Sequence, residues 1–126
     1  MDRLNPPQRR ILLAGALLAA LGVALGAFGA HALGASLGAR ELGWWETAVQ
    51  YQMWHAIALL ALPALPVPRP GRAALLLGTG TLIFSGTLYI MALTGLRWLG
   101  AVTPIGGTLM IAGWLLLAWQ VARRPA

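Results

Sequence analysis

Residues 11–33 read ILLAGALLAALGVALGAFGAHAL, a run without an acidic residue, a lysine or an arginine. A helix needs about 20 consecutive apolar residues to cross a bilayer core that is about 30 Å thick. The run is also longer than the roughly 7 to 15 apolar residues of a secretory signal core, although Arg9 and Arg10 before it and Ala30 and Ala32 within it imitate a signal peptide. We therefore expect residues 11–33 to form the first transmembrane helix.

Three further, predominantly apolar runs follow at residues 44–65, 73–95 and 98–121. Hydrophobic residues make up 59% of the 126 residues and charged residues 10%, whereas a soluble domain carries about 25% charged residues. A chain of this size cannot hide so much apolar surface in a soluble core. The sequence predicts an all-α integral membrane four-helix bundle, with residues 1–126 forming one four-span transmembrane domain and no separate soluble domain.

The arginines lie between the apolar runs, seven on one side of the predicted membrane and two on the other. The seven are Arg3, Arg9, Arg10, Arg69, Arg72, Arg123 and Arg124, and the two are Arg40 and Arg97. Because a surplus of arginine marks the cytoplasmic side, we expect both termini to be cytoplasmic in a multi-pass membrane protein. The net charge of +6 is then a topology signal with some attraction to anionic lipids, and it requires no nucleic-acid partner.

Small residues recur at helical spacing in two of the runs. In the first run the spacings are 4, 3, 4 and 3, through Gly15, Ala19, Gly22, Gly26 and Gly29, which we call the glycine seam. The third run has a similar row in Ala74, Gly78, Thr81 and Ser85. Small residues let transmembrane helices approach closely, so the sequence predicts that the first and third helices form a tightly packed pair.

Polar residues gather at the start of the second run. On a helix, one face would carry Trp45, Val49, Met53, Ala56 and Leu60, and another would carry Thr47, Tyr51 and His55. We expect the first face to meet lipid and the second to face the protein interior, because polar groups in hydrocarbon need partners. Tyr89, Thr81 and Ser85 of the third run are the expected partners of His55. An alternative stays open, in which residues 38–52 lie along the membrane surface and His55 is shallow.

The fourth run contains Thr103 and Pro104, which predict a helix that begins at Pro104 with Thr103 as its N-cap. The tryptophans divide into two groups. Trp44, Trp45, Trp98 and Trp119 fit the aromatic belts at the membrane surfaces. Trp54 and Trp114 lie deeper, so we expect their indole N–H groups to find partners inside the protein.

Four ordered motifs give the chain a family resemblance. They are GAFGAHAL at residues 26–33, WETAVQYQMWHAIALL at 45–60, FSGTLY at 84–89, and TPIGG at 103–107 with Gly113 and Trp114. With these the chain resembles the domain-of-unknown-function 423 family of small bacterial inner-membrane proteins, which is related to eukaryotic transmembrane protein 256. The resemblance implies a four-span membrane protein and brings no mechanism with it.

The candidate binding residues are polar side chains within or beside the runs, namely His31, Glu46, Gln50, Tyr51, His55, Tyr89 and Thr103. We expect most of them to form hydrogen bonds between helices. A shared metal or haem at His31 and His55 is disfavoured, because the helical rise separates them by about 13 Å in depth. A proton relay through Glu46, Tyr51 and His55 stays open. We predict no catalytic residue, no metal site and no cofactor, and the absence of cysteine excludes thiol chemistry.

The function predicted from these residues is non-enzymatic. The leading interpretation is a membrane scaffold, an accessory subunit of a larger assembly or a small-ligand binder, in contact with the lipid bilayer and with a membrane protein partner or a second copy. The alternative is a small oligomeric transporter or channel that uses the polar face with Tyr51 and His55. Small four-span exporters that insert in both orientations need a weak charge bias, and the seven-to-two arginine bias disagrees with that.

Overall fold

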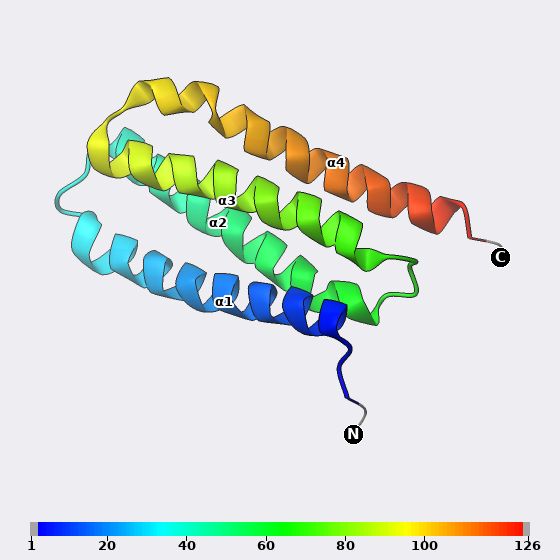
Figure 1. Cartoon of the computed structure of the whole chain (residues 1–126). Coiled ribbons are helices and arrows are strands. Elements are labelled where there is room, and N and C mark those ends of the chain that lie inside the picture. Colours follow the sequence, from blue (N-terminus) through cyan, green and yellow to red (C-terminus); the bar gives the residue numbers. More distant parts are fainter. Residues whose placement is uncertain (1–2, 125–126) are drawn as a thin grey trace.

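The computed structural model describes residues 3–124 and is all-α over that range. Its four long helices are α1 (Pro6–Phe28), α2 (Ala39–Ala61), α3 (Pro70–Thr94) and α4 (Thr103–Ala122) (Figure 1). A π-helical turn at Gly29–Leu33 follows α1, and 3-10 turns at Leu62–Ala64 and Arg97–Ala101 follow α2 and precede α4. The prediction of an all-α protein with four helices is thus confirmed.

The helices pack in the order of the chain, α1 against α2, α2 against α3, and α3 against α4. Within the described part of the chain, α4 makes a close backbone approach to α3 but to neither α1 nor α2. In Figure 1, α1 and α4 form the two outer edges, with α2 and α3 between them. The arrangement is therefore a layer of four helices in which the closest backbone contacts join helices that are consecutive in the chain.

Helix boundaries depart from the predicted runs by several residues. α1 begins at Pro6, earlier than predicted, because Asn5 caps the helix and exchanges two hydrogen bonds with Gln8 in a capping box. α2 begins at Ala39 and continues without a break to Ala61. Trp45 and Ala48 of this helix bond to α1 and α3, so residues 39–52 pack against neighbouring helices in one continuous helix with residues 53–61.

The glycine seam of α1 faces protein, as predicted, but its partner is α2 and not α3. A methyl group placed on Gly22 would lie 2.5 Å from the Met53 Sδ atom, and one on Gly29 would lie 2.5 Å from the Trp45 Cδ1 atom. The seam thus leaves space for large side chains of α2. The predicted tight pairing of α1 with α3 is wrong, because bulky residues of α2 fill the space along the seam and α1 meets α3 only in a smaller contact around Ile11.

α3 makes its tightest contact with α4, through glycines outside the predicted row. A methyl group on Gly106 would collide with the Phe84 backbone nitrogen and lie 2.6 Å from the Gly80 carbonyl oxygen. Gly78, which belonged to the predicted row, has open space around it. The α3–α4 contact is therefore made main chain against main chain at Gly80 and Gly106.

The two ends of the layer differ in charge. The starts of α1 and α3 and the end of α4 lie at one end of the layer, where Figure 1 places both termini and the link between α2 and α3. The seven arginines belong to these segments, whereas Arg40 in the first turn of α2 and Arg97 in the link between α3 and α4 lie at the opposite end. The seven-to-two division of the sequence is thus a division between two ends of the folded chain.

Candidate functional site

Gln52 of α2 connects three helices through its amide group. Its Nε2 donates to the carbonyl of Leu18 in α1 at 2.8 Å. The hydroxyl of Tyr89 in α3 donates to its Oε1 at 2.7 Å. Gln50, the predicted site residue, is exposed, whereas Gln52, which was not predicted, is buried. A spacing of 3, 4, 4 and 3 through Trp45, Ala48, Gln52, Ala56 and Leu59 could have identified this buried face.

Trp45 lies inside the protein, so its predicted position facing lipid is wrong. Its side chain is 3% exposed, and its indole Nε1 donates to the carbonyl of Leu25 in α1 at 2.9 Å. The ring also packs edge-on against Tyr89, with centroids 4.7 Å apart. The indole is drawn inward because it gains a hydrogen-bond acceptor there and because Gly29 leaves room for it.

His55 is buried, and both of its ring nitrogens have partners. Nδ1 lies 2.7 Å from the Tyr51 carbonyl oxygen, and Nε2 lies 3.1 Å from the indole Nε1 of Trp114 in α4. A carbonyl accepts and an indole N–H donates, so Nδ1 carries the hydrogen and Nε2 accepts. This assignment follows from the hydrogen-bond network. The imidazole therefore acts as a hydrogen-bonded link between α2 and α4.

The partner of His55 confirms one prediction and corrects another. His55 does bond to another helix, and Trp114 does find a partner inside the protein, as predicted. The partner was expected on α3, however, where the polar side chains are engaged elsewhere. Thr81 donates to the Leu77 carbonyl, Ser85 to the Ala48 carbonyl, and Tyr89 to Gln52.

Trp54 differs from its prediction because its indole is 56% exposed. Its ring packs against Tyr51, with centroids 5.1 Å apart. Tyr51 in turn packs on Phe84 of α3 at 4.6 Å. The Trp54 ring therefore lies on the outer side of α2 instead of in the core, and the Tyr51 ring packs against both Trp54 and Phe84.

The aromatic side chains border a groove of about 410 Å³ between α2 and α4, with α3 as its floor. Its lining residues are Tyr51, Trp54, His55, Phe84, Gly107, Met110, Ile111 and Trp114. We call it the α2–α4 groove. Most of its lining is apolar or aromatic, and the polar edges come from the imidazole, the indole groups and the phenol. Ligand sites in proteins have this composition and a volume of roughly 300–1,000 Å³.

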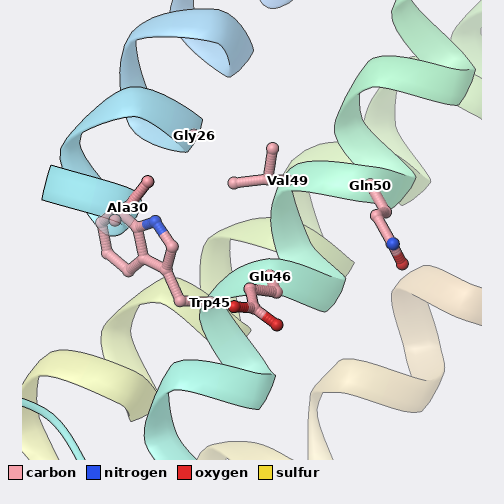
Figure 2. A pocket seen from close by; sticks show the side chains of 7 residues that line it. Gly26, Ala30, Trp45, Glu46, Val49 and Gln50 are labelled. Carbon is pink, nitrogen blue, oxygen red and sulfur yellow. The ribbon is translucent and has the colours of Figure 1, made fainter. Parts of the chain in front are cut away.

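A second, smaller pocket of about 260 Å³ lies between the end of α1 and the start of α2. Figure 2 shows Trp45 and Val49 of α2 beside Gly26 of α1 and Ala30 of the following π-helical turn, while Gln50 extends away from α1. Glu46 also lines this pocket but is exposed. The pocket therefore carries two predicted site residues at its rim and none that is enclosed.

The structure does not bring all the predicted site residues together. His31 is exposed on the π-helical turn. Thr103 is buried at the start of α4, where its hydroxyl lies 2.6 Å from that of Thr87 in α3. It also donates to the Leu99 carbonyl instead of capping a helix at Pro104, since α4 begins at Thr103 itself. Among residues 3–124, no group of three or more histidine, cysteine, aspartate or glutamate side chains could hold a metal ion.

Comparisons with known proteins place the chain in one family. Residues 25–107 match the family described as "Protein of unknown function (DUF423)". The UPF0382 membrane protein SH2409 of Staphylococcus haemolyticus is 46% identical over 109 residues, which cover 84% of this chain and 89% of the relative. The UPF0382 inner membrane protein YgdD of Escherichia coli K12 is 42% identical over 113 residues, covering 86% of each. No solved structure matches the chain.

Three helical segments of residues 3–124 are long and apolar enough to cross a membrane, Pro6–Leu33, Pro70–Thr94 and Arg97–Ala122. The names of the relatives place them in the membrane as well. The chain is thus an integral protein of the bacterial cytoplasmic membrane, and it belongs to the DUF423 family.

Proposed function

We propose that this protein is a non-enzymatic four-span membrane protein that binds a small apolar molecule from the bilayer in the α2–α4 groove. The observation that carries the proposal is the groove itself, an aromatic-walled space of about 410 Å³ between two helices without close backbone contact. A molecule that partitions into lipid can reach it sideways. The aromatic rings offer flat contact surfaces, and the indole of Trp54 is exposed there.

The four-span part of the proposal depends on α2, which is less apolar than the three helices named above. α2 packs along both α1 and α3. Its buried polar side chains are bonded to the neighbouring helices, as at Gln52 and His55. Satisfied polar groups cost less in the membrane than free ones. Four spans also agree with the placement of both termini at one end of the layer (Figure 1).

The orientation follows from the arginines, since the end with seven of them is expected to be cytoplasmic. Reporter domains fused after Ala126 and inserted at Gly71, in the first turn of α3 beside the α2–α3 link, test this. Both reporters should give the cytoplasmic signal. An external signal at either position would contradict the four-span arrangement or its orientation.

The polar side chains of the core are already used in hydrogen bonds within the protein, which agrees with a non-enzymatic role. Both nitrogens of His55 are used in hydrogen bonds, and the Ser85 hydroxyl donates to the Ala48 carbonyl at 2.8 Å. A general base or a nucleophile needs a free lone pair directed at a substrate. These groups instead hold helices together.

Photo-crosslinking in native membranes tests the ligand proposal. A photoreactive amino acid at Ile111 reports on the groove, and one at Leu115 provides a matched control outside it, because the two side chains are 61% and 64% exposed. We expect Ile111 to capture one defined small molecule that is absent from the adducts of Leu115. The same mixture of bulk lipids at both positions would contradict the proposal. A protein captured at Ile111 would favour a scaffold or accessory subunit instead.

A further inference from the structure

Four arginines from two separate segments meet at the arginine-rich end of the layer. Arg69 and Arg72 come from the start of α3, and Arg123 and Arg124 follow the end of α4. With Pro68, Trp119 and Gln120 they line a pocket of about 450 Å³, which we call the basic pocket. Repulsion between like charges opposes such a cluster unless an anion compensates it. The positive charge of the pocket therefore favours the binding of an anionic ligand.

The basic pocket is built by specific contacts of its lining residues. The buried side chain of Gln120 donates from Nε2 to the Pro68 carbonyl at 3.0 Å, which ties the end of α4 to the link before α3. Its Oε1 has no partner within the described residues. A buried amide oxygen without a hydrogen-bond donor costs stability. The contact between Gln120 and Pro68 is present despite that cost.

The backbone at Arg69 is also specific. Arg69 adopts a left-handed conformation, with φ 50° and ψ 58°, between Pro68 and Pro70. This conformation is unfavourable for a residue with a side chain. Backbone strain of this kind often marks a site where a side chain must be presented in a fixed direction. Here it places Arg69 at the wall of the basic pocket.

An aromatic contact orients a second arginine of the pocket. The guanidinium carbon of Arg123 lies 4.7 Å from the centre of the Trp119 ring, a cation–π geometry. Trp119 is 54% exposed at the end of α4, where tryptophan side chains commonly sit at the level of lipid headgroups. The pocket therefore opens where the membrane meets water.

We propose that the basic pocket binds the phosphate group of an anionic phospholipid headgroup. Arginine forms bidentate hydrogen bonds with phosphate, and basic pockets between transmembrane helices at the cytoplasmic side bind anionic headgroups. The acidic residues within 3–124, Glu41 and Glu46, belong to the start of α2 at the opposite end. The site is separate from the α2–α4 groove, and the argument for it does not depend on what the groove holds.

Native mass spectrometry of the full chain in detergent tests the proposal. Phosphatidylglycerol and phosphatidylcholine with the same acyl chains are added separately, and the lipid adducts are compared. We expect the wild-type protein to bind phosphatidylglycerol about tenfold more tightly. The variant R72Q/R123Q removes two charges from the basic pocket and should lose most of that preference. The variant R3Q/R9Q removes two charges that do not line this pocket and should keep the preference within about twofold.

Two outcomes would overturn the proposal. Equal losses in R72Q/R123Q and R3Q/R9Q would show diffuse attraction to the whole charged end instead of a site. Full displacement of phosphatidylglycerol by millimolar inorganic phosphate or glycerol phosphate would assign the pocket to a soluble anion instead of a lipid. Thermal unfolding of each variant in the same detergent should be unchanged, because all four substituted arginines are exposed.

Discussion

The α1–α2 contact and the α3–α4 contact both depend on glycine, but they use it in different ways. At Gly22 of α1 and at Gly29 of the π-helical turn that follows, the absence of a side chain leaves space that Met53 and Trp45 of α2 fill. In α3 and α4, Gly80 and Gly106 bring two main chains together. This difference predicts that replacing a glycine that faces a flexible side chain lowers the free energy of unfolding moderately, whereas replacing a glycine that faces backbone lowers it more.

The largest effect is expected for Gly106→Ala. Its methyl group would collide with the backbone of Phe84 and Gly80, and neither can move without shifting α3. Overpacking costs about 1–3 kcal/mol, and we expect the upper part of that range here. Unfolding in a denaturing detergent titration measures it. Stability equal to that of the wild-type protein would show that the α3–α4 contact is looser than described.

A smaller effect is expected for Gln52→Leu, which removes the polar link between α1, α2 and α3. The substitution leaves the Tyr89 hydroxyl without its acceptor, and hydrogen bonds between transmembrane helices contribute about 0.6 kcal/mol on average and at most about 1.7. We expect a loss of about 1–2 kcal/mol in the same titration. Gln50→Leu is the matched control, because Gln50 is exposed. Equal effects of the two substitutions would contradict the bridging role of Gln52.

Gly22→Ala should cost about 1 kcal/mol or less, because the obstacle is the Met53 thioether, which can turn aside. Gly22→Leu exceeds what that movement can accommodate and should cost more. Ala20→Leu on an exposed face of α1 serves as the control and should be tolerated. If Gly22→Ala were as damaging as Gly106→Ala, the distinction between the two kinds of glycine contact would fail.

The smallest effect is expected for Gly78→Ala, since open space surrounds this position. Alanine favours a helix over glycine by up to about 1 kcal/mol, so the variant should be as stable as the wild-type protein or slightly more stable. A clear loss of stability would indicate that Gly78 meets another protein surface, such as a second copy, which the isolated chain does not contain.

The four helices and the division of charge between the two ends could be predicted from the sequence. Uncharged runs and the glycine spacing in α1 are local signals, and a helical period translates them directly into one face. Pairing between helices is not local. The first and third runs both carry small residues, yet α1 packs on α2 because Met53 and Trp45 match the space along the glycine seam.

The candidate site was predicted only in part, for a related reason. A polar residue in an apolar run must find a partner, and that rule correctly identified His55 and Trp114 as residues that bond to another helix, although Trp114 is 43% exposed. It could not decide which helix supplies the partner, or that Gln52 is enclosed while Gln50 is exposed. The rotation of α2 that encloses Gln52 is fixed by the hydrogen bonds of Trp45 and Gln52 to α1 and of His55 to α4, and these depend on the packing of helices that are distant in sequence.

The hydrogen bonds of α2 also bear on how the chain enters the membrane during synthesis. Gln52 and Trp45 both donate to carbonyls of α1, which leaves the ribosome before α2 does. The most polar of the four helices can therefore satisfy two of its donors as soon as it is made, by pairing with its predecessor as a hairpin. Tyr89 of α3 reaches Gln52 only later. Insertion of α2 should consequently depend on the helix before it, and a chain that lacks α1 should fail to integrate α2 even though α3 and α4 remain apolar enough to insert.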